Sequence, residues 1–131
     1  MKEVDILVVG SGAGGLLSAL VAAENHADVL VVEKEDQWGG TSATSGAGIW
    51  IPDSDNAKEV GFEDDTEEAY KYVRGLSKKN VPNENIRAYV ENAAEMLRWL
   101  QAKTPVRYQA FPYPDYHAEN SGGSPTGYRT H

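Results

Sequence analysis

The first third of the chain alternates between short apolar runs and a segment with helix-like composition. Residues 4–9 (VDILVV), which end at Gly10, are rich in β-branched side chains and predict a buried parallel strand. Residues 14–25 are small and apolar and predict a helix, and residues 29–33 (VLVVE) predict a second buried strand. A strand, a helix and a strand within about thirty residues predict one right-handed βαβ unit.

The pattern changes after the second strand. Residues 38–52 form a loop of small residues, rich in glycine, serine and threonine. Asp65, with Glu68 three positions later, resembles a capping box and predicts a helix that continues to about Gly75.

An amphipathic helix is predicted over residues 83–103. Its apolar positions recur at the i, i+3, i+4, i+7 spacing of one helix face and are Ile86, Tyr89, Val90, Ala93, Ala94, Leu97 and Leu100. Thr104-Pro105 ends it, and residues 106–110 are a candidate strand. Residues 112–131 are rich in Pro, Gly, Ser and Tyr and have no period.

Composition narrows the classes of protein. The 131 residues carry a formal net charge of −8 and a mean hydropathy of −0.51, which fits a globular domain. The chain has no cysteine, so disulfides, thiolate chemistry and Fe–S clusters are excluded. Its acidity argues against nucleic acid and anionic lipid as partners. The three histidines lack the spacing of metal ligands, and no metal site is predicted.

Targeting signals are not expected. The longest apolar stretch near the N-terminus, residues 16–23, is far shorter than the roughly 20 residues that a membrane span needs. Residues 1–3 lead straight into the first strand pattern with no cationic leader, so a cytoplasmic location is expected.

The glycines mark a site for a dinucleotide. Residues 10–15 (GSGAGG) match G-x-G-x-x-G, and the match follows a predicted strand and opens a predicted helix. In this motif Gly10 permits a tight turn, Gly12 lets a pyrophosphate approach the backbone, and Gly15 lets helix and strand pack closely. The free N–H groups of the helix start and the helix dipole both favour the phosphate.

An acid follows at the expected distance. Glu33, 18 residues after Gly15, ends the second strand, where a carboxylate accepts hydrogen bonds from the ribose of an adenosine. Its charge disfavours a 2′-phosphate and hence NADP. The neighbouring Lys34 is included with it as a candidate at the same end of the cofactor.

A second glycine pair distinguishes FAD from NAD. Gly39-Gly40 and the hydroxyls after it suit a long, extended cofactor, because a loop without bulky side chains can run beside its pyrophosphate and ribityl chain. The spacing of Gly46 and Gly48 leaves room for an isoalloxazine ring. A flexible linker is the alternative, but Trp50 and Ile51 argue against it.

These motifs together resemble a known family. Residues 5–52 resemble the FAD-binding start of the fumarate reductase/succinate dehydrogenase flavoprotein superfamily. Residues 45–52 (SGAGIWIP) resemble the S-G-G-G-[IV]-W-[IV]-P segment of its 3-ketosteroid dehydrogenase branch. A helix with RAYVEN and LRWL at residues 87–100, and YPDYH at residues 113–117 before Gly122-Gly123, point to the same branch.

The resemblance implies a site. The implied cofactor contacts are Gly10, Gly12, Ala13, Gly14, Gly15, Glu33, Lys34, Gly40, Thr41, Ser42, Ser45, Gly46, Ala47 and Gly48. Thr41 occupies the position at which the succinate dehydrogenase branch carries a histidine bound covalently to FAD, so non-covalent FAD is expected. Ala47 replaces the usual middle glycine of the flavin loop.

The resemblance also implies a reaction. Tyr116 is the catalytic candidate, because the tyrosine of the P-D-Y motif assists a second tyrosine that removes a proton beside the 3-keto group. Hydride then passes to flavin N5. The expected function is 3-ketosteroid dehydrogenation, and the partner is a small apolar ketone such as a steroid. Packing over a Pro-rich loop is the alternative role of Tyr116, and Asp115 is a candidate turn cap.

Two alternatives for the function stay open. One is a fumarate-reductase-like reductase of unsaturated carboxylates, although such chemistry needs arginines that clamp carboxylates, and the loop at residues 46–52 offers Trp and Ile. The other is a nucleotide-binding or interaction module without activity, or an incomplete, non-catalytic FAD-binding piece of an enzyme. Assays with a 3-ketosteroid and with fumarate separate the two enzymes, and uptake of FAD separates both from an inert module.

The expected fold class is α/β, the N-terminal part of a Rossmann-like FAD-binding domain and incomplete. A doubly wound sheet normally has five or six strands, and two good ones are found. The expected division is a βαβ unit and flavin loop at residues 1–56, then a helical segment and Pro/Gly/Tyr-rich loop at residues 57–131. Two strands cannot close a sheet, so self-association through unpaired edges is expected.

Overall fold

The structure is a computed structural model that describes residues 3–131. It forms two compact units, one that ends at Ala47 and one from Gly48 to His131, and each is described by itself. The expectation about a leader falls partly on Met1 and Lys2, which lie outside the described residues. The division expected between residues 56 and 57 stays a prediction about the domains of the protein.

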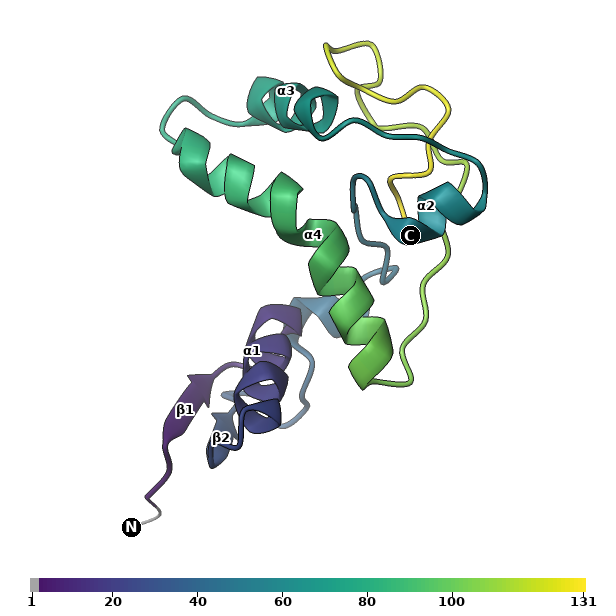
Figure 1. Ribbon diagram of the computed structural model, residues 1–131. Helices are drawn as coiled ribbons and strands as arrows, with labels where there is room; N and C mark the ends of the chain where they lie inside the picture. Colours follow the sequence, from purple (N-terminus) through teal and green to yellow (C-terminus); the bar gives the residue numbers. More distant parts are fainter. Residues whose placement is uncertain (1–2) are drawn as a thin grey trace. The chain divides into compact units, whose positions relative to one another are not determined.

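The first unit is the predicted βαβ unit (Figure 1). It contains β1 (Ile6–Val9), α1 (Ala13–Glu24) and β2 (Val29–Val32). The strands pair in parallel over their full length, with Ile6 opposite Val29 and Val9 opposite Val32. One helix therefore covers a two-stranded sheet, and the mixed α/β class is confirmed.

Glycine permits the close packing of α1 on the strand before it. A Cβ built on Gly15 would lie 2.1 Å from the carbonyl oxygen of Gly10, so no other residue fits there without movement of the backbone. Gly10 itself has φ +97°, in the left-handed region that favours glycine, and its N–H donates to the carbonyl of Val32. The turn between β1 and α1 is thus tied to the end of β2.

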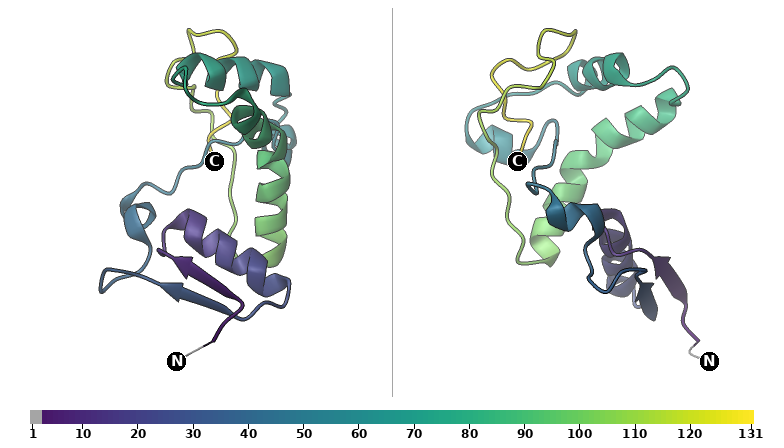
Figure 2. Two further views of the ribbon diagram at one scale, coloured as in Figure 1. Left: turned by 90° about the vertical axis from the view of Figure 1, so that its left-hand side faces the viewer. Right: turned by 180° about the vertical axis from the view of Figure 1, so that it is seen from behind.

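The second unit is mainly helical. It contains α2 (Asp55–Glu59), α3 (Thr66–Leu76) and α4 (Asn83–Lys103), and α3 lies against the first half of α4 in both figures (Figures 1 and 2). A small core forms where Ile51 meets Ala93 and Leu97 of α4, all at most 4% exposed. Four positions of the predicted apolar stripe of α4 are therefore buried, Ile86, Val90, Ala93 and Leu97, whereas Tyr89 is 43% exposed.

The helix boundaries follow from local chemistry. The predicted bounds of α4 are confirmed. The Asp65 side chain accepts hydrogen bonds from the backbone N–H groups of Glu67 and Glu68, so it caps α3 as predicted. The reciprocal arm of a capping box is not formed, because the N–H of Asp65 donates to the Asp64 side chain instead. The short α2 was not predicted.

The candidate strand at residues 106–110 is wrong. Its polar backbone groups find side chains rather than a neighbouring strand: the N–H of Tyr108 donates to Gln101, and the carbonyl of Tyr108 accepts from Asn56. Only Phe111, just beyond it, forms a bridge, with Thr130.

The end of the chain returns to the start of the second unit. Ile49 and His131 exchange two backbone hydrogen bonds, and the N–H of Ile51 donates to the carbonyl of Arg129. Thr130 thereby lies between Trp50 and Phe111, bridged to both in antiparallel fashion. Within residues 3–131, no helix is long and apolar enough to cross a membrane.

Candidate functional site

The turn between β1 and α1 presents the features of a phosphate site. Gly12 is the N-cap of α1, with extended backbone and no side-chain cap, and the first turn of the helix carries no acid. The start of the helix thus offers backbone donors and the positive end of its dipole, without a competing carboxylate. This is where the sequence motif places the pyrophosphate.

Glu33 follows the last residue of β2 and is held by four donors. One oxygen, Oε2, accepts from the backbone N–H and the hydroxyl of Ser11, at 2.8 and 2.6 Å. The other, Oε1, accepts from the N–H groups of Lys34 and Glu35, at 2.8 and 3.2 Å. Hydrogen bonds from the side chain and backbone of Ser11, with those from Glu35 and Lys34, lower the pKa of Glu33 to about 2. The carboxylate is therefore ionised at any physiological pH.

The second glycine loop lies against the first. Gly39 and Gly40 have φ of +110° and +53°, and the loop continues as a 3-10 helix, η1 (Gly40–Thr44). A Cβ on Gly40 would lie 3.3 Å from the Cα of Gly12. The hydroxyl of Ser42 accepts from the N–H of Ala13 at 3.1 Å. Both glycine clusters thus meet at the start of α1, as a cofactor that spans them requires.

The other predicted contacts are less closely held. Thr41 and Ser42 supply carbonyls to the hydroxyls of Thr44 and Ser45, so η1 is braced internally. The ammonium of Lys34 is exposed and pairs with Glu35. Gly14 follows Ala13 in the first turn of α1, and Gly46 lies in the exposed loop after η1.

Two flavin-loop positions differ from the rest. Ala47 has φ +61°, a conformation that glycine adopts without strain, and its N–H donates to the hydroxyl of Ser45. The substitution of the usual glycine therefore places a methyl group on a left-handed turn. Gly48 begins the second unit, where its neighbours are Thr130 and His131.

These features fit FAD. A cavity of about 340 Å³ beside the acid is lined by Val9, Gly10, Val32, Glu33 and Lys34. Its walls are mostly apolar, which suits the flat adenine ring, and Glu33 at its edge suits the ribose. The first backbone N–H groups of α1 and the side-chain-free Gly12 suit the pyrophosphate. FAD would accordingly be held by Gly12, Ala13, Glu33 and the loop at residues 39–46.

Sequence reasoning missed Ser11. Its position is an unconstrained x of the G-x-G-x-x-G pattern, yet the residue is only 2% exposed. Its hydroxyl donates to Glu33 and accepts from the N–H of Gly39 at 2.8 Å. No pattern in the sequence signals this, since the three residues share no periodicity.

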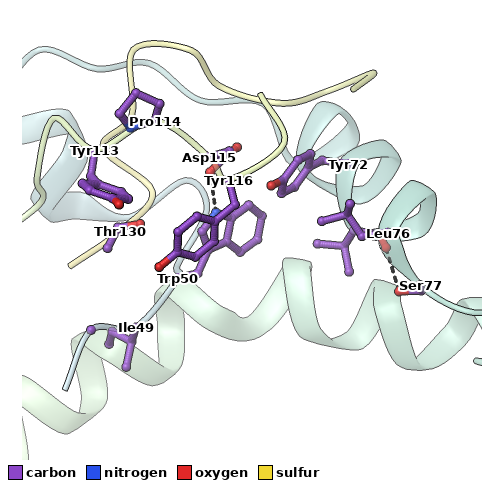
Figure 3. Close-up of a pocket in the computed structure, with 12 residues that line it drawn as sticks. Ile49, Trp50, Tyr72, Leu76, Ser77, Tyr113, Pro114, Asp115, Tyr116 and Thr130 are labelled. Atoms are coloured by element: carbon purple, nitrogen blue, oxygen red, sulfur yellow. Dashed lines mark hydrogen bonds between the residues drawn. The ribbon is translucent and has the colours of Figure 1, made fainter. Parts of the chain in front are cut away.

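The second unit contains an aromatic pocket of about 410 Å³ (Figure 3). Its lining residues come from the loop at 48–50, from α3, from the loop at 113–116 and from Thr130; they include Trp50, Tyr72, Leu76, Tyr113, Pro114 and Tyr116. The rings of Trp50 and Tyr72 stack at 5.7 Å, and Tyr113 meets Tyr116 edge to face at 6.0 Å. Tyr116 is 85% exposed at the mouth.

A buried ionic cluster holds one wall of this pocket. The carboxylate of Asp115 accepts from the indole N–H of Trp50 at 2.6 Å, from the N–H of Ser124 at 2.8 Å and from Arg129 at 3.0 Å. Arg129 also donates twice to Asp64, at 2.6 and 2.8 Å. Asp115 is therefore more than the turn cap expected for it. Its bonds anchor the loop at the position directly before Tyr116.

The charges of the cluster stabilise one another. Burial on its own would raise the pKa of Asp64, but the hydrogen bonds and charge of Arg129 outweigh it and lower that pKa. Burial likewise works against the Arg129 charge, and its two carboxylate partners nonetheless raise its pKa. The guanidinium therefore stays paired in the interior.

His131 is also buried. It is one of the three histidines whose spacing predicts no metal site. Its Nε2 lies 2.7 Å from the hydroxyl of Ser54, the cap of α2, and its Nδ1 lies 3.0 Å from the carbonyl of Arg129. Burial lowers the pKa of His131, so the ring is neutral. Across the described part of the chain, no group of three or more His, Cys, Asp or Glu side chains could hold a metal ion.

Comparison with known proteins shows a similarity to FAD-binding enzymes. The model of the FAD binding domain family matches residues 5–130. A 3-oxosteroid 1-dehydrogenase of Mycolicibacterium smegmatis is 41% identical over 127 residues, which are 96% of this chain and 22% of that enzyme.

Solved structures agree with this. The crystal structure of a 3-ketosteroid Δ1-dehydrogenase from Sterolibacterium denitrificans, in complex with 1,4-androstadiene-3,17-dione, has a TM-score of 0.85 and 38% identity; it covers 97% of this chain and 22% of its own. An open flavocytochrome c3 fumarate reductase has a TM-score of 0.70 and 25% identity over 76% of this chain and 18% of its own. The chain spans about a fifth of the length of the enzymes it matches.

Proposed function

The chain belongs to the FAD binding domain family, and from that premise we propose that it is the cofactor-binding part of an FAD-dependent oxidoreductase that dehydrogenates 3-ketosteroids. Membership of this family identifies FAD as the cofactor. The substrate and the reaction belong to the proposal, because the chain represents only part of the length of its relatives.

The observation that carries the substrate class is the aromatic pocket. Its walls are formed by rings and aliphatic groups such as Trp50, Tyr72 and Leu76, and a flat apolar ring system buries well against such surfaces. The likeness to enzymes that act on 3-oxosteroids supports the same class.

In this proposal, the first unit binds FAD. The turn at residues 10–15 binds the pyrophosphate, and Glu33 accepts the ribose hydroxyls. When bound, FAD accepts the hydride that leaves the substrate. Thr41 cannot form the covalent link that a histidine forms at the matching position in the succinate dehydrogenase branch, so the cofactor is held non-covalently.

Tyr116 supports removal of the proton beside the ketone. A phenol has an unperturbed pKa of about 10, so it needs neighbouring groups to take part in proton transfer near neutral pH. The anchoring of Asp115 fixes the backbone beside this exposed ring, and Tyr113 packs against its edge. Tyr116 is thus held at the pocket mouth, where a substrate would meet it.

Reduction of fumarate is less well supported. That reaction needs arginines free to bind two carboxylates, and the aromatic pocket has no arginine among its lining residues. Arg129, whose guanidinium lies near this pocket, is ion-paired with Asp64 and Asp115.

The test uses the full-length protein with FAD. We expect turnover of a 3-ketosteroid with an artificial electron acceptor, and none with fumarate. Tyr116→Phe should lower kcat by at least about a hundredfold, the lower end of what a positioned proton-transfer group contributes. Tyr113→Phe, which deletes the other phenol of the same ring pair, should keep kcat within a few-fold. Turnover of fumarate but not of steroid contradicts the proposal.

The mode of attachment has its own measurement. Acid precipitation of the holoprotein should release all the flavin into the supernatant. Flavin that stays with the precipitated polypeptide contradicts non-covalent binding.

A further inference from the structure

The side chain of Ser11 contacts both Glu33 and the second glycine loop. Its hydroxyl has one proton to donate, which goes to Glu33 Oε2 at 2.6 Å, and it accepts one from the N–H of Gly39 at 2.8 Å. Its own N–H also donates to Glu33 at 2.8 Å. At 2% exposure these bonds are shielded from water.

Two other contacts join the glycine clusters, and neither involves Glu33. Ser42 accepts from Ala13 at 3.1 Å, and Gly40 lies near Gly12, but neither touches Glu33. Without the Ser11 hydroxyl, no side-chain hydrogen bond within residues 3–131 would join the second loop to the carboxylate. The orientation of the acid relative to the second loop therefore depends on this hydroxyl.

The two oxygens of Glu33 are not equivalent. A carboxylate offers about four lone-pair sites, and four donors occupy them here. The two Ser11 bonds fix Oε2, whereas Oε1 is held by local backbone N–H groups, with the longest of the four bonds, 3.2 Å from Glu35. Ser11 thus fixes one oxygen, and a ribose hydroxyl would take the place of the longest bond on the other, the one from Glu35.

We propose that Ser11 is a positioning residue for FAD: its hydroxyl joins Glu33 to the second glycine loop before the cofactor binds, and so presents a preformed, ionised ribose acceptor. Preorganisation of this kind reduces the ordering cost that binding must offset. The inference rests on the proposed function only in taking FAD as the ligand, and it concerns affinity rather than turnover.

The first experiment measures FAD affinity. FAD is titrated into the apoprotein of the full-length chain, and flavin fluorescence gives Kd. Ser11→Ala should raise Kd about 10- to 100-fold, the range for loss of a hydrogen bond to a charged group. Ser18→Ala is the matched control, because the Ser18 hydroxyl donates only within α1, to the carbonyl of Gly14; its Kd should stay within about twofold of the wild type.

The second experiment separates positioning from a merely structural role. The Ser11 hydroxyl is the largest cause of the low pKa of Glu33, so its removal moves that pKa toward the ordinary value of 4.5. In the wild type, Glu33 should leave Kd unchanged between pH 7 and pH 4. In Ser11→Ala, Kd should rise as the pH falls from 5 to 4, and Ser11→Ala combined with Glu33→Gln should abolish that extra rise.

Each outcome decides the matter. An unchanged Kd in Ser11→Ala overturns the proposal, as does a weaker Kd without the new pH dependence. If the alanine variant does not fold, Ser11→Cys keeps the buried volume with a poor hydrogen-bonding group, and the same two results are required of it. A wild-type apoprotein that takes up no FAD contradicts the proposed function as well, whereas equal affinities of wild type and variant leave that function standing.

Discussion

At Gly15 the polypeptide has no room for a side chain, since a Cβ there would meet the carbonyl oxygen of Gly10 at 2.1 Å. The obstacle is backbone, which cannot rotate away as a flexible side chain could. His131 represents the opposite case, a large polar ring that the interior accepts because both of its nitrogens have partners. Single residues thus set the packing of both units.

Gly15→Ala should destabilise the first unit by about 1–3 kcal/mol, the usual cost of overpacking, because α1 must move away from the turn. Thermal unfolding of the full-length apoprotein measures it. Gly75→Ala is the control: a Cβ on Gly75 meets nothing within 4 Å, and the change replaces glycine inside α3. It should stabilise α3 by roughly 0.5–1 kcal/mol. Equal effects of the two variants would contradict the packing argument.

His131 should make stability depend on pH. Burial lowers its pKa in the folded protein below the ordinary 6.5, so below that pH the unfolded chain binds the proton more readily than the folded one. The contribution of His131 to stability is complete above pH 6.5 and declines as the pH falls below it. Denaturant unfolding at pH 8 and pH 5.5 should show a smaller loss in His131→Gln than in the wild type. An identical loss in both would show that folding does not lower the pKa of this ring.

Between elements, polar side chains provide much of the connection in the second unit. The Asp64–Arg129–Asp115 cluster joins the approach to α3 to the loop at 113–116, with the two ion pairs buried. The indole of Trp50 joins the same cluster and also stacks between Tyr72 and Tyr89. Apolar packing is centred on the small core between Ile51 and α4.

Arg129→Met should cost about 3–5 kcal/mol, because it leaves two buried carboxylates without their cation. Unfolding in urea, monitored by tryptophan fluorescence, is a suitable measurement, since Trp50 borders the cluster. Arg98→Met is the matched control. Its pair with Asp55 lies on the surface, and loss of such a pair typically costs about 0–1 kcal/mol. Comparable losses in the two variants would mean that the cluster adds nothing beyond a surface pair.

Local patterns predicted the elements whose causes are local. The apolar stripe of α4 and the Asp65 cap of α3 lie within a few residues of the helices they define. The glycine clusters and Glu33 were likewise found from spacing alone. Ser11, the cluster of Arg129 and the pair of Ser54 with His131 were not, because each joins residues far apart in sequence that follow no period. The strand expected before Phe111 failed for the same reason, since side chains of α2 and α4 satisfy that backbone.

At the scale of the whole chain, the first unit buries little of its apolar surface. None of the residues of α1 is fully buried, and Leu7 and Val9 of β1 are 56% and 80% exposed. The described sheet has two strands, each with an outer edge free of a partner strand. A chain that spans about a fifth of its relatives' length leaves such surfaces without the cover that a larger sheet gives.

The 131-residue chain, prepared as a separate polypeptide, should therefore self-associate. Sedimentation velocity over a range of concentrations should show a weight-average mass that rises with concentration. Val9→Lys places a charge on the most exposed strand position and should shift association to higher concentration. A single monomeric species at all concentrations would show that the exposed strands do not mediate contact.

The pairing of residues 49–51 with residues 129–131 has a consequence for biosynthesis. Trp50 leaves the ribosome long before Thr130 has been translated, so the backbone partners of Ile49 and Ile51 do not yet exist at that time. The second unit thus completes its pairing only after most of it has been synthesised, and contacts this distant in sequence form slowly. During that interval the apolar residues 49–51 lack their native neighbours. Chaperones of nascent chains bind exposed apolar segments of this kind.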